Sequence, residues 1–166
     1  MKSMLLLALM PAIALAQKPP AACPLLTDAE ISAATGMKVG KGQSFELPAK
    51  KTNGCMWKVG ETGMVNVSVN PMAPTKEQHD AAMASYRQMY ERLKAAGWTV
   101  TESKLGDALC HTAMPPKAQS DQTPAMTGCV AEARGFALAV GFAGPHSKLA
   151  PEKIKPLVDD AVKRLP

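Results

Sequence analysis

The four cysteines constrain the fold of this chain more than any of its other residues. They are Cys23, Cys55, Cys110 and Cys129. An even number of cysteines predicts disulfide bonds when a chain is exported, because thiols oxidise outside the reducing cytoplasm. The sequence contains no Cys-x-x-Cys pair, so it has neither a thioredoxin-like redox motif nor a zinc-ribbon motif. The compartment in which the chain folds therefore decides how these cysteines are interpreted.

The N-terminus has the pattern of a secretory signal peptide. Lys2 supplies a short positive region, residues 4–14 form an apolar run, and Ala14-Leu15-Ala16 matches a small-residue cleavage site. The run is shorter than the roughly 20 apolar residues that a membrane-spanning helix needs. A buried N-terminal helix is the alternative interpretation. We expect residues 1–16 to be removed, Gln17 to become the N-terminus, and the mature protein to be periplasmic or secreted.

Three helices are predicted from capping residues and apolar periodicity. Thr27 with Glu30, and Thr75 with Gln78, form capping boxes that mark the starts of a short and a long helix. A third helix is predicted over residues 151–165. Apolar residues recur at helical spacing along the long helix, which predicts that this stripe faces the core. The stripe consists of Ala82, Met83, Tyr86, Met89, Tyr90 and Leu93.

The segments between the helices have the alternation and the turn residues of β-strands. Between residues 64 and 70, valines alternate with asparagine and serine, which predicts one buried and one polar face. Further strands are predicted over residues 37–47, 55–59, 98–103, 105–114, 127–135 and 136–144.

This pattern predicts an α+β fold in which one or more antiparallel sheets are covered by helices, in the order α-βββ-α-ββββ-α. The hairpins argue against a doubly wound parallel sheet. The expected organisation is a signal peptide at 1–16, an extended lead-in at 17–26, and a single α+β domain at 27–166.

The predicted strands indicate which cysteines pair. Cys110 lies in the strand that enters the segment 115–126, and Cys129 lies in the strand that leaves it. If these strands pair, the two cysteines can face each other, and closing the loop would add about 3 kcal/mol of stability. Cys23 and Cys55 would then form a second bridge, for about 3.5 kcal/mol on the same model.

Four short motifs resemble a loose group of small exported bacterial domains. They are CPLLTDAEI at 23–31, CMW at 55–57, LGDA at 105–108 and AVKRL at 161–165. Many members of this group are lipoproteins whose α/β sandwiches are similar to the PsbP-like fold. This chain departs from them because no cysteine directly follows the cleavage site, so we expect no membrane anchor. The group shares no catalytic motif, and the resemblance implies a binding or accessory module.

Composition and motifs argue against several function classes. The formal net charge of +5 is spread along the chain, and no basic run with interleaved aromatics suggests nucleic-acid binding. A hydrolytic triad would need His79, His111 or His146 as its base, yet no Gly-x-Ser-x-Gly elbow occurs. Asp159 and Asp160 are adjacent on a helix and point in different directions. We therefore expect no enzyme and no cofactor.

A soft-metal site is the alternative function. His111, Met114 and Met126 lie close in sequence, and imidazole with thioether ligands suits Cu(I). No Met-x-x-Met or His-x-Met repeat supports such a site. Methionines also fill irregular core gaps, and Met64, Met83 and Met89 are interpreted as core residues.

The sequence favours an exported, disulfide-stabilised binding or accessory module of the cell envelope. It would act by protein–protein contact, either as an inhibitor or immunity-type partner of an unknown envelope or secreted protein, or as an accessory subunit. Loops on a rigid scaffold commonly carry binding residues, so segment 115–126 and the turn 144–148 are the candidate surfaces. The candidate binding residues are Lys117, Gln119, Asp121, Gln122 and His146.

Overall fold

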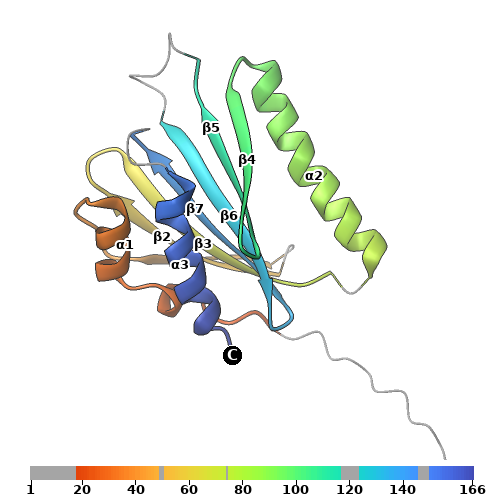
Figure 1. The fold of residues 1–166 in the computed structure, drawn as a ribbon. Coiled ribbons are helices and arrows are strands. Elements are labelled where there is room, and N and C mark those ends of the chain that lie inside the picture. Colours follow the sequence, from red (N-terminus) through yellow and green to blue (C-terminus); the bar gives the residue numbers. More distant parts are fainter. Residues whose placement is uncertain (1–17, 49–50, 74, 117–123, 146–149) are drawn as a thin grey trace, which may run out of the picture.

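The computed structural model describes residues 18–48, 51–73, 75–116, 124–145 and 150–166 (Figure 1). It confirms the α+β class and the order α-βββ-α-ββββ-α. The described strands form a seven-stranded antiparallel sheet in the order β1-β2-β3-β7-β6-β5-β4. The elements are a 3-10 turn η1 (Cys23–Leu25), α1 (Asp28–Thr35), β1 (Gln43–Leu47), β2 (Thr52–Val59), β3 (Gly63–Pro71), α2 (Lys76–Ala95), β4 (Thr99–Leu105), β5 (Ala108–Met114), β6 (Ala125–Ala133), β7 (Phe136–Gly144) and α3 (Pro151–Lys163).

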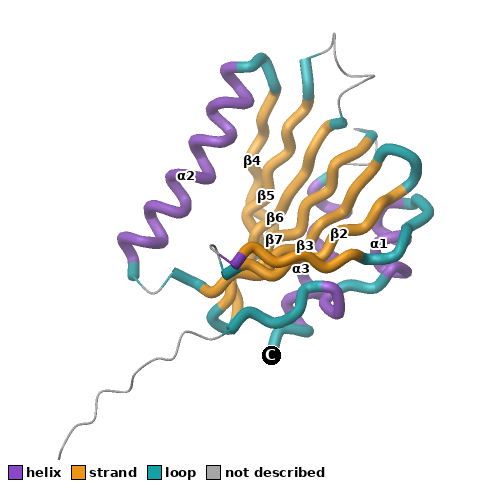
Figure 2. The backbone as a smooth tube through the Cα atoms, turned by 180° about the vertical axis from the view of Figure 1, so that it is seen from behind, coloured by secondary structure: helices purple, strands orange, loops and turns teal. Residues whose placement is uncertain are grey.

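The helices divide between the two faces of the sheet. Helices α1 and α3 lie together on one face, whereas α2 lies on the opposite face near the edge strand β4, as the two opposite views show (Figures 1 and 2). We call the face under α1 and α3 the inner face and the face toward α2 the outer face. Because α2 contacts mainly β4, the outer face is covered much less completely than the inner face.

The inner face carries the hydrophobic core, as the alternation in the sequence predicts. On β3, Val65, Val67 and Val69 are buried, and the intervening polar residues point to the outer face. Strand β7 contributes the largest set of core side chains at alternate positions. They are Phe136, Leu138, Val140 and Phe142.

Two disulfides tie this core together, in the pairing that the sequence predicts. Cys110 and Cys129 are directly opposite each other on β5 and β6, with a Cα–Cα distance of 4.0 Å. Cys23 is bridged to Cys55 on β2 with a Cα–Cα distance of 4.9 Å. Both distances lie within the roughly 7 Å that a bridge can span. These bonds point to an exported, non-cytoplasmic protein, because such disulfides persist in oxidising compartments.

The N-terminal lead-in differs from the extended segment that the sequence predicts. Residues 23–25 form a 3-10 turn, and Leu25 and Leu26 are buried in the core. The bridge from Cys23 explains the difference, because it holds this segment against β2. The segment is therefore part of the folded core.

Helix α1 begins as its capping residues predict. Thr27 Oγ1 accepts from the backbone N–H of Glu30, and the Glu30 carboxylate accepts from the backbone N–H of Thr27. Arg164, just after α3, donates to the same carboxylate, and this bond is the main reason why the pKa of Glu30 is lowered to about 2. At α2, Thr75 Oγ1 accepts from the backbone N–H of Gln78.

The apolar stripe predicted for α2 is wrong in part. Tyr90 is buried, and His79, Met83, Tyr86 and Leu93 are half-buried. Met89 and Met64, interpreted as core residues, are 46% and 40% exposed respectively, and Ala82 is exposed as well. The physical reason is that α2 rests on the sheet along a narrow line, so it covers about one side chain per turn at least partly and leaves both its flanking positions and Met64 on β3 in solvent.

Candidate functional site

A groove of about 650 Å³ lies between α2 and the outer face of the sheet. Its floor is built from β3, β7, β6 and β5, one wall is the first half of α2, and Met72 and Ala73, just after β3, also line it. The lining residues are Ser68, Asn70, Pro71, Met72, Ala73, His79, Ala82, Met83, Tyr86, Asp107, Leu109, Val130, Glu132, Ala137, Leu138 and Ala139.

Small side chains on β7 create the hollow. Strand alternation sends the bulky residues of FALAVGFAG to the inner face and leaves Ala137, Ala139, Gly141 and Ala143 on the outer face. The register places Ala139 between Ser68 on β3 and Val130 on β6. Because the outer face of β7 carries only alanine and glycine, its side chains do not fill the space between the sheet and α2, and the groove is deepest along β7.

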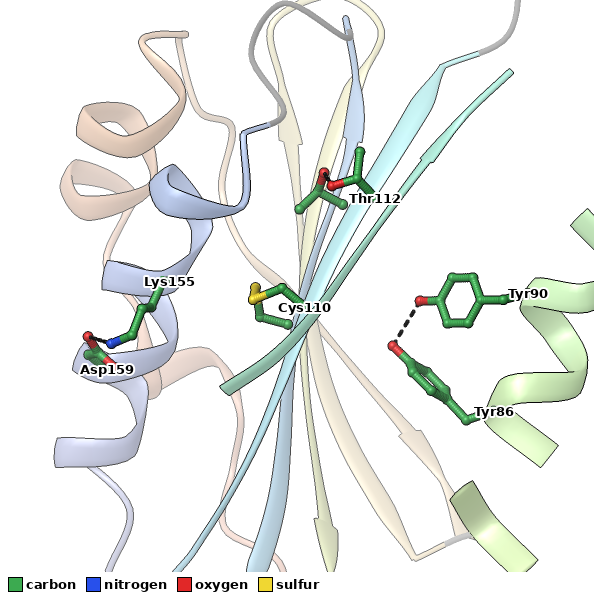
Figure 3. Close-up of a disulfide and its surroundings, with 8 residues drawn as sticks. Tyr86, Tyr90, Cys110, Thr112, Lys155 and Asp159 are labelled. Atoms are coloured by element: carbon green, nitrogen blue, oxygen red, sulfur yellow. Dashed lines mark hydrogen bonds and ion pairs between the residues drawn. A yellow bond between two sulfur atoms is a disulfide. The ribbon is translucent and has the colours of Figure 1, made fainter. Parts of the chain in front are cut away.

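An aromatic cluster attaches the second half of α2 to the sheet. The ring of Tyr90 stacks on His111 of β5 with centroids 4.2 Å apart, and Tyr86 meets the same imidazole edge-on at 5.4 Å. The hydroxyl of Tyr90 donates to the hydroxyl oxygen of Tyr86 at 2.9 Å. Figure 3 shows these tyrosines on one side of β5 and the Cys110 disulfide on the other. Cys110 and His111, which are successive residues of β5, therefore point to opposite faces of the sheet.

His111 is part of this attachment and is only 5% exposed. Its Nε2 lies 2.9 Å from a carboxylate oxygen of Glu102 on β4, and among the described residues its Nδ1 has no hydrogen-bond partner. Burial raises the pKa of Tyr90 and of Tyr86, so both phenols keep their protons at neutral pH. The cluster is a packed anchor with little access for solvent.

A second attachment crosses the groove at the beginning of α2. His79 Nε2 lies 2.7 Å from Glu132 Oε1 on β6. The carboxyl-bearing residue Asp107 belongs to the same end of the groove. Asp107 lies in the turn between β4 and β5, two residues before Leu109, which pairs with Val130, and both Asp107 and Glu132 line the groove. The groove thus has a carboxylate end and an apolar body.

The structure separates the residues of the proposed copper site. His111 points to the outer face, whereas Met114 lies three residues further along the same strand, packs against the inner core, and so points to the opposite face. Met126 is on the outer face and 37% exposed. Because His111 and Met114 lie on opposite sides of the sheet, these three residues cannot bind one ion. Among the described residues, no group of three or more His, Cys, Asp or Glu could hold a metal ion.

The loop residues predicted to bind a partner lie outside the described residues. They are Lys117, Gln119, Asp121, Gln122 and His146. Of the three histidines considered as a base, His79 is in the groove and His111 is in the aromatic cluster. Asp159 and Asp160 form ion pairs with Lys155 and Lys163 along α3, as on a solvated helix face.

The groove itself was not predicted from the sequence. The available signal was that every second residue of FALAVGFAG is alanine or glycine. This pattern indicates that one face of the strand carries only small side chains and leaves space above it. A second hollow, of about 490 Å³, lies between α1 and α3 and includes Ala33, Lys153 and Leu157 in its lining. None of the described helices is long and apolar enough to cross a membrane.

Comparisons with known proteins define the class of fold. No family model matches this chain, and no curated protein matches it. Among solved structures, it is similar to the extracellular domain of PknH from Mycobacterium tuberculosis, with a TM-score of 0.56 and 14% identity. The match covers 85% of this chain and 92% of that domain. At this identity the similarity concerns the fold alone.

Proposed function

We propose that this protein is an exported, non-catalytic binding module of the cell envelope that holds a ligand in the groove between α2 and the outer face of the sheet. The observation that carries the proposal is the groove itself. Its volume of about 650 Å³ falls in the range of about 300–1,000 Å³ that is usual for small-molecule sites.

The lining supports this proposal. Ligand sites are mostly apolar, with a few polar groups that orient the ligand. Here Met83, Leu109, Val130 and the alanines of β7 supply the apolar surface, Ser68 adds one hydroxyl beside Ala139, and the charged side chains are Glu132, Asp107 and His79. Methionine suits such a wall, because its flexible side chain adapts to different shapes.

Two observations support a periplasmic or secreted location. The disulfides require an oxidising compartment. The similar solved structure is described as an extracellular domain. A signal peptide at 1–16 agrees with both, and this segment lies outside the described residues.

A protein partner is the alternative occupant, as the sequence predicts for an inhibitor or immunity-type module. The exposed side chains of Met64 and Met126, which flank Ala143 on the outer face, are an apolar surface beyond the groove that favours this alternative. The groove is a concave hollow under α2, which favours a small ligand over a flat protein surface.

Filling the groove tests the proposal. Phenylalanine in Ala139→Phe would occupy the floor between Ser68 and Val130. We expect the neutral fluorescent probe N-phenyl-1-naphthylamine to bind the wild-type protein and to bind this variant at least tenfold more weakly, a difference of about 1.4 kcal/mol. A fluorescence titration measures both affinities.

Ala143→Phe is the matched control. Ala143 lies on the same strand and the same face but is not part of the groove lining. We expect this variant to bind the probe like the wild type, with both variants unfolding in a single cooperative transition. Equal loss of binding in the two variants, or no binding to the wild type, would contradict a site in the groove.

A further inference from the structure

We propose that the groove binds an amphipathic amine, a molecule with an apolar chain and a protonated amino group, with the ammonium at Glu132 and the chain along β7. This inference rests on the proposed function and adds the chemical class of the ligand. Three features carry it: the charge of the groove, the bonding of Glu132, and the order of polar and apolar residues along the floor.

The charge of the groove is opposite to that of the protein. The chain has 19 Lys and Arg against 14 Asp and Glu. Among the described residues, the groove lining includes Glu132 and Asp107 but no lysine or arginine. His79 can neutralise at most one of these carboxylates, so the lining stays negative whether or not its imidazole is protonated; Lys104, which pairs with Leu109 from β4, lies outside the lining. A negative site in a basic protein attracts cations and repels anions.

Glu132 already holds a nitrogen in this position. Its Oε1 lies 2.7 Å from His79 Nε2, which shows that a nitrogen reaching over from α2 fits here. Only Oε1 takes part in this contact. A carboxylate has about four lone-pair sites on two oxygens, so Oε2 can accept from a second donor without loss of the His79 bond. A bond between an ammonium and a carboxylate is charge-assisted and stronger than a neutral one.

The order of charged and apolar residues along the groove indicates where the ammonium group and the alkyl chain of the ligand would lie. Glu132 on β6 is followed along the outer face by Val130, which pairs with Leu109 on β5, and Asp107 lies in the turn that precedes β5. Ala139 continues this floor on β7, with Ser68 beside it on β3, and Met83 lines the groove from α2. An alkyl chain that extends from the carboxylates over this floor would remove apolar surface from water at roughly 25 cal/mol per Å².

Three eight-carbon compounds test the class of ligand. Octylamine, 1-octanol and octanoate share one chain and differ in the charge of the head group at pH 7. Each is titrated against the protein loaded with N-phenyl-1-naphthylamine. We expect octylamine to displace the probe at least ten times more tightly than octanoate, which corresponds to about 1.4 kcal/mol. Octanol should fall between them.

Substitutions test whether the two carboxylates cause the preference for octylamine. The double change Glu132→Gln with Asp107→Asn should bring octylamine to within about threefold of octanol. Glu91→Gln removes the same kind of charge from α2, outside the groove lining, where Glu91 pairs with Lys94, and should leave the preference intact. His79→Gln removes the imidazole but keeps both carboxylates, so it should also keep the preference.

The outcomes separate this inference from the function on which it rests. If the probe binds and all three compounds compete equally, or octanoate competes best, the amine assignment is wrong and the groove remains a binding site. An unchanged preference in the double variant would also overturn it. If the probe binds but only a lysine-bearing peptide displaces it, the ligand is a protein segment. If neither the probe nor any compound binds, the proposed function itself fails.

Discussion

Trp57→Ala should lower the free energy of unfolding by about 3–5 kcal/mol, the largest effect that we expect from a single substitution. Trp57 on β2 is 2% exposed and is the largest fully buried side chain among the described residues. Its indole N–H donates to Asp28 at the start of α1 with a distance of 2.9 Å. The backbone of Gly42 packs so closely against the ring that an added Cβ would lie 2.7 Å from Nε1. Alanine would therefore leave a cavity between β2, the start of α1 and the backbone at Gly42.

Urea denaturation, followed by circular dichroism, measures this loss. Trp98→Ala is the control, because Trp98 is the other tryptophan and is only half-buried, so its removal should cost clearly less. Trp57→Phe keeps an aromatic ring but loses the bond to Asp28, and should lie between the wild type and Trp57→Ala. A loss below about 1 kcal/mol for Trp57→Ala would contradict the packing described for the core.

Removing the β5–β6 disulfide should also lower the free energy of unfolding by a large amount. We expect the double change Cys110→Ala with Cys129→Ala to cost about 3 kcal/mol, because the bridge closes a loop across a separation of 19 residues and limits the freedom of the unfolded chain. The two cysteines face the inner side of the sheet, whereas His111, the next residue, packs under Tyr90 on the outer side. The attachment of α2 should therefore survive in the variant.

Two measurements check this prediction. Urea denaturation gives the change in stability, and peptide mapping of the oxidised wild type without reduction should recover Cys110 linked to Cys129 and Cys23 linked to Cys55. Removal of Cys23 and Cys55 is a useful comparison, because the separation of 32 residues predicts a slightly larger loss of about 3.5 kcal/mol. Reactive thiols at Cys110 and Cys129 in the native protein, or a different pairing, would contradict the structure.

Local patterns in the sequence predicted the parts of the fold that depend on neighbouring residues. The alternation from Val65 to Val69 gave the correct buried face of β3, and Thr27 with Glu30 gave the correct start of α1. The cysteine pairing followed from placing Cys110 and Cys129 on paired strands. For β3 and α1 one local rule is sufficient, because no distant segment changes the outcome, whereas the cysteine pairing also required that the two strands around segment 115–126 pair.

The errors arise where distant segments decide the outcome. A helical period predicts a stripe on α2 but not how much of it the sheet covers, so Met89 was assigned to the core although it is exposed. The groove depends on the strand order β3-β7-β6, which brings Ser68, Ala139 and Val130 together from separate parts of the chain. No local pattern predicts that order.

The copper hypothesis failed for a reason that the sequence already contained. Residues three apart on a strand point to opposite faces, so His111 and Met114 could not face one ion once the strand was assigned. The role that His111 has instead, as the surface on which Tyr90 stacks, depends on α2 crossing β5 at that point. This contact joins a helix, α2, to a strand, β5, so it can be recognised only in the tertiary structure.

The most direct test of the account is to locate the bound probe by nuclear magnetic resonance. Backbone amide shifts of the ¹⁵N-labelled mature protein would be followed during titration with N-phenyl-1-naphthylamine. The groove predicts the largest shifts at Met83, Leu109, Val130 and Ala139, which come from α2, β5, β6 and β7. Shifts confined to the hollow between α1 and α3, at Ala33, Lys153 and Leu157, or no saturable shifts at all, would contradict a binding site in the groove.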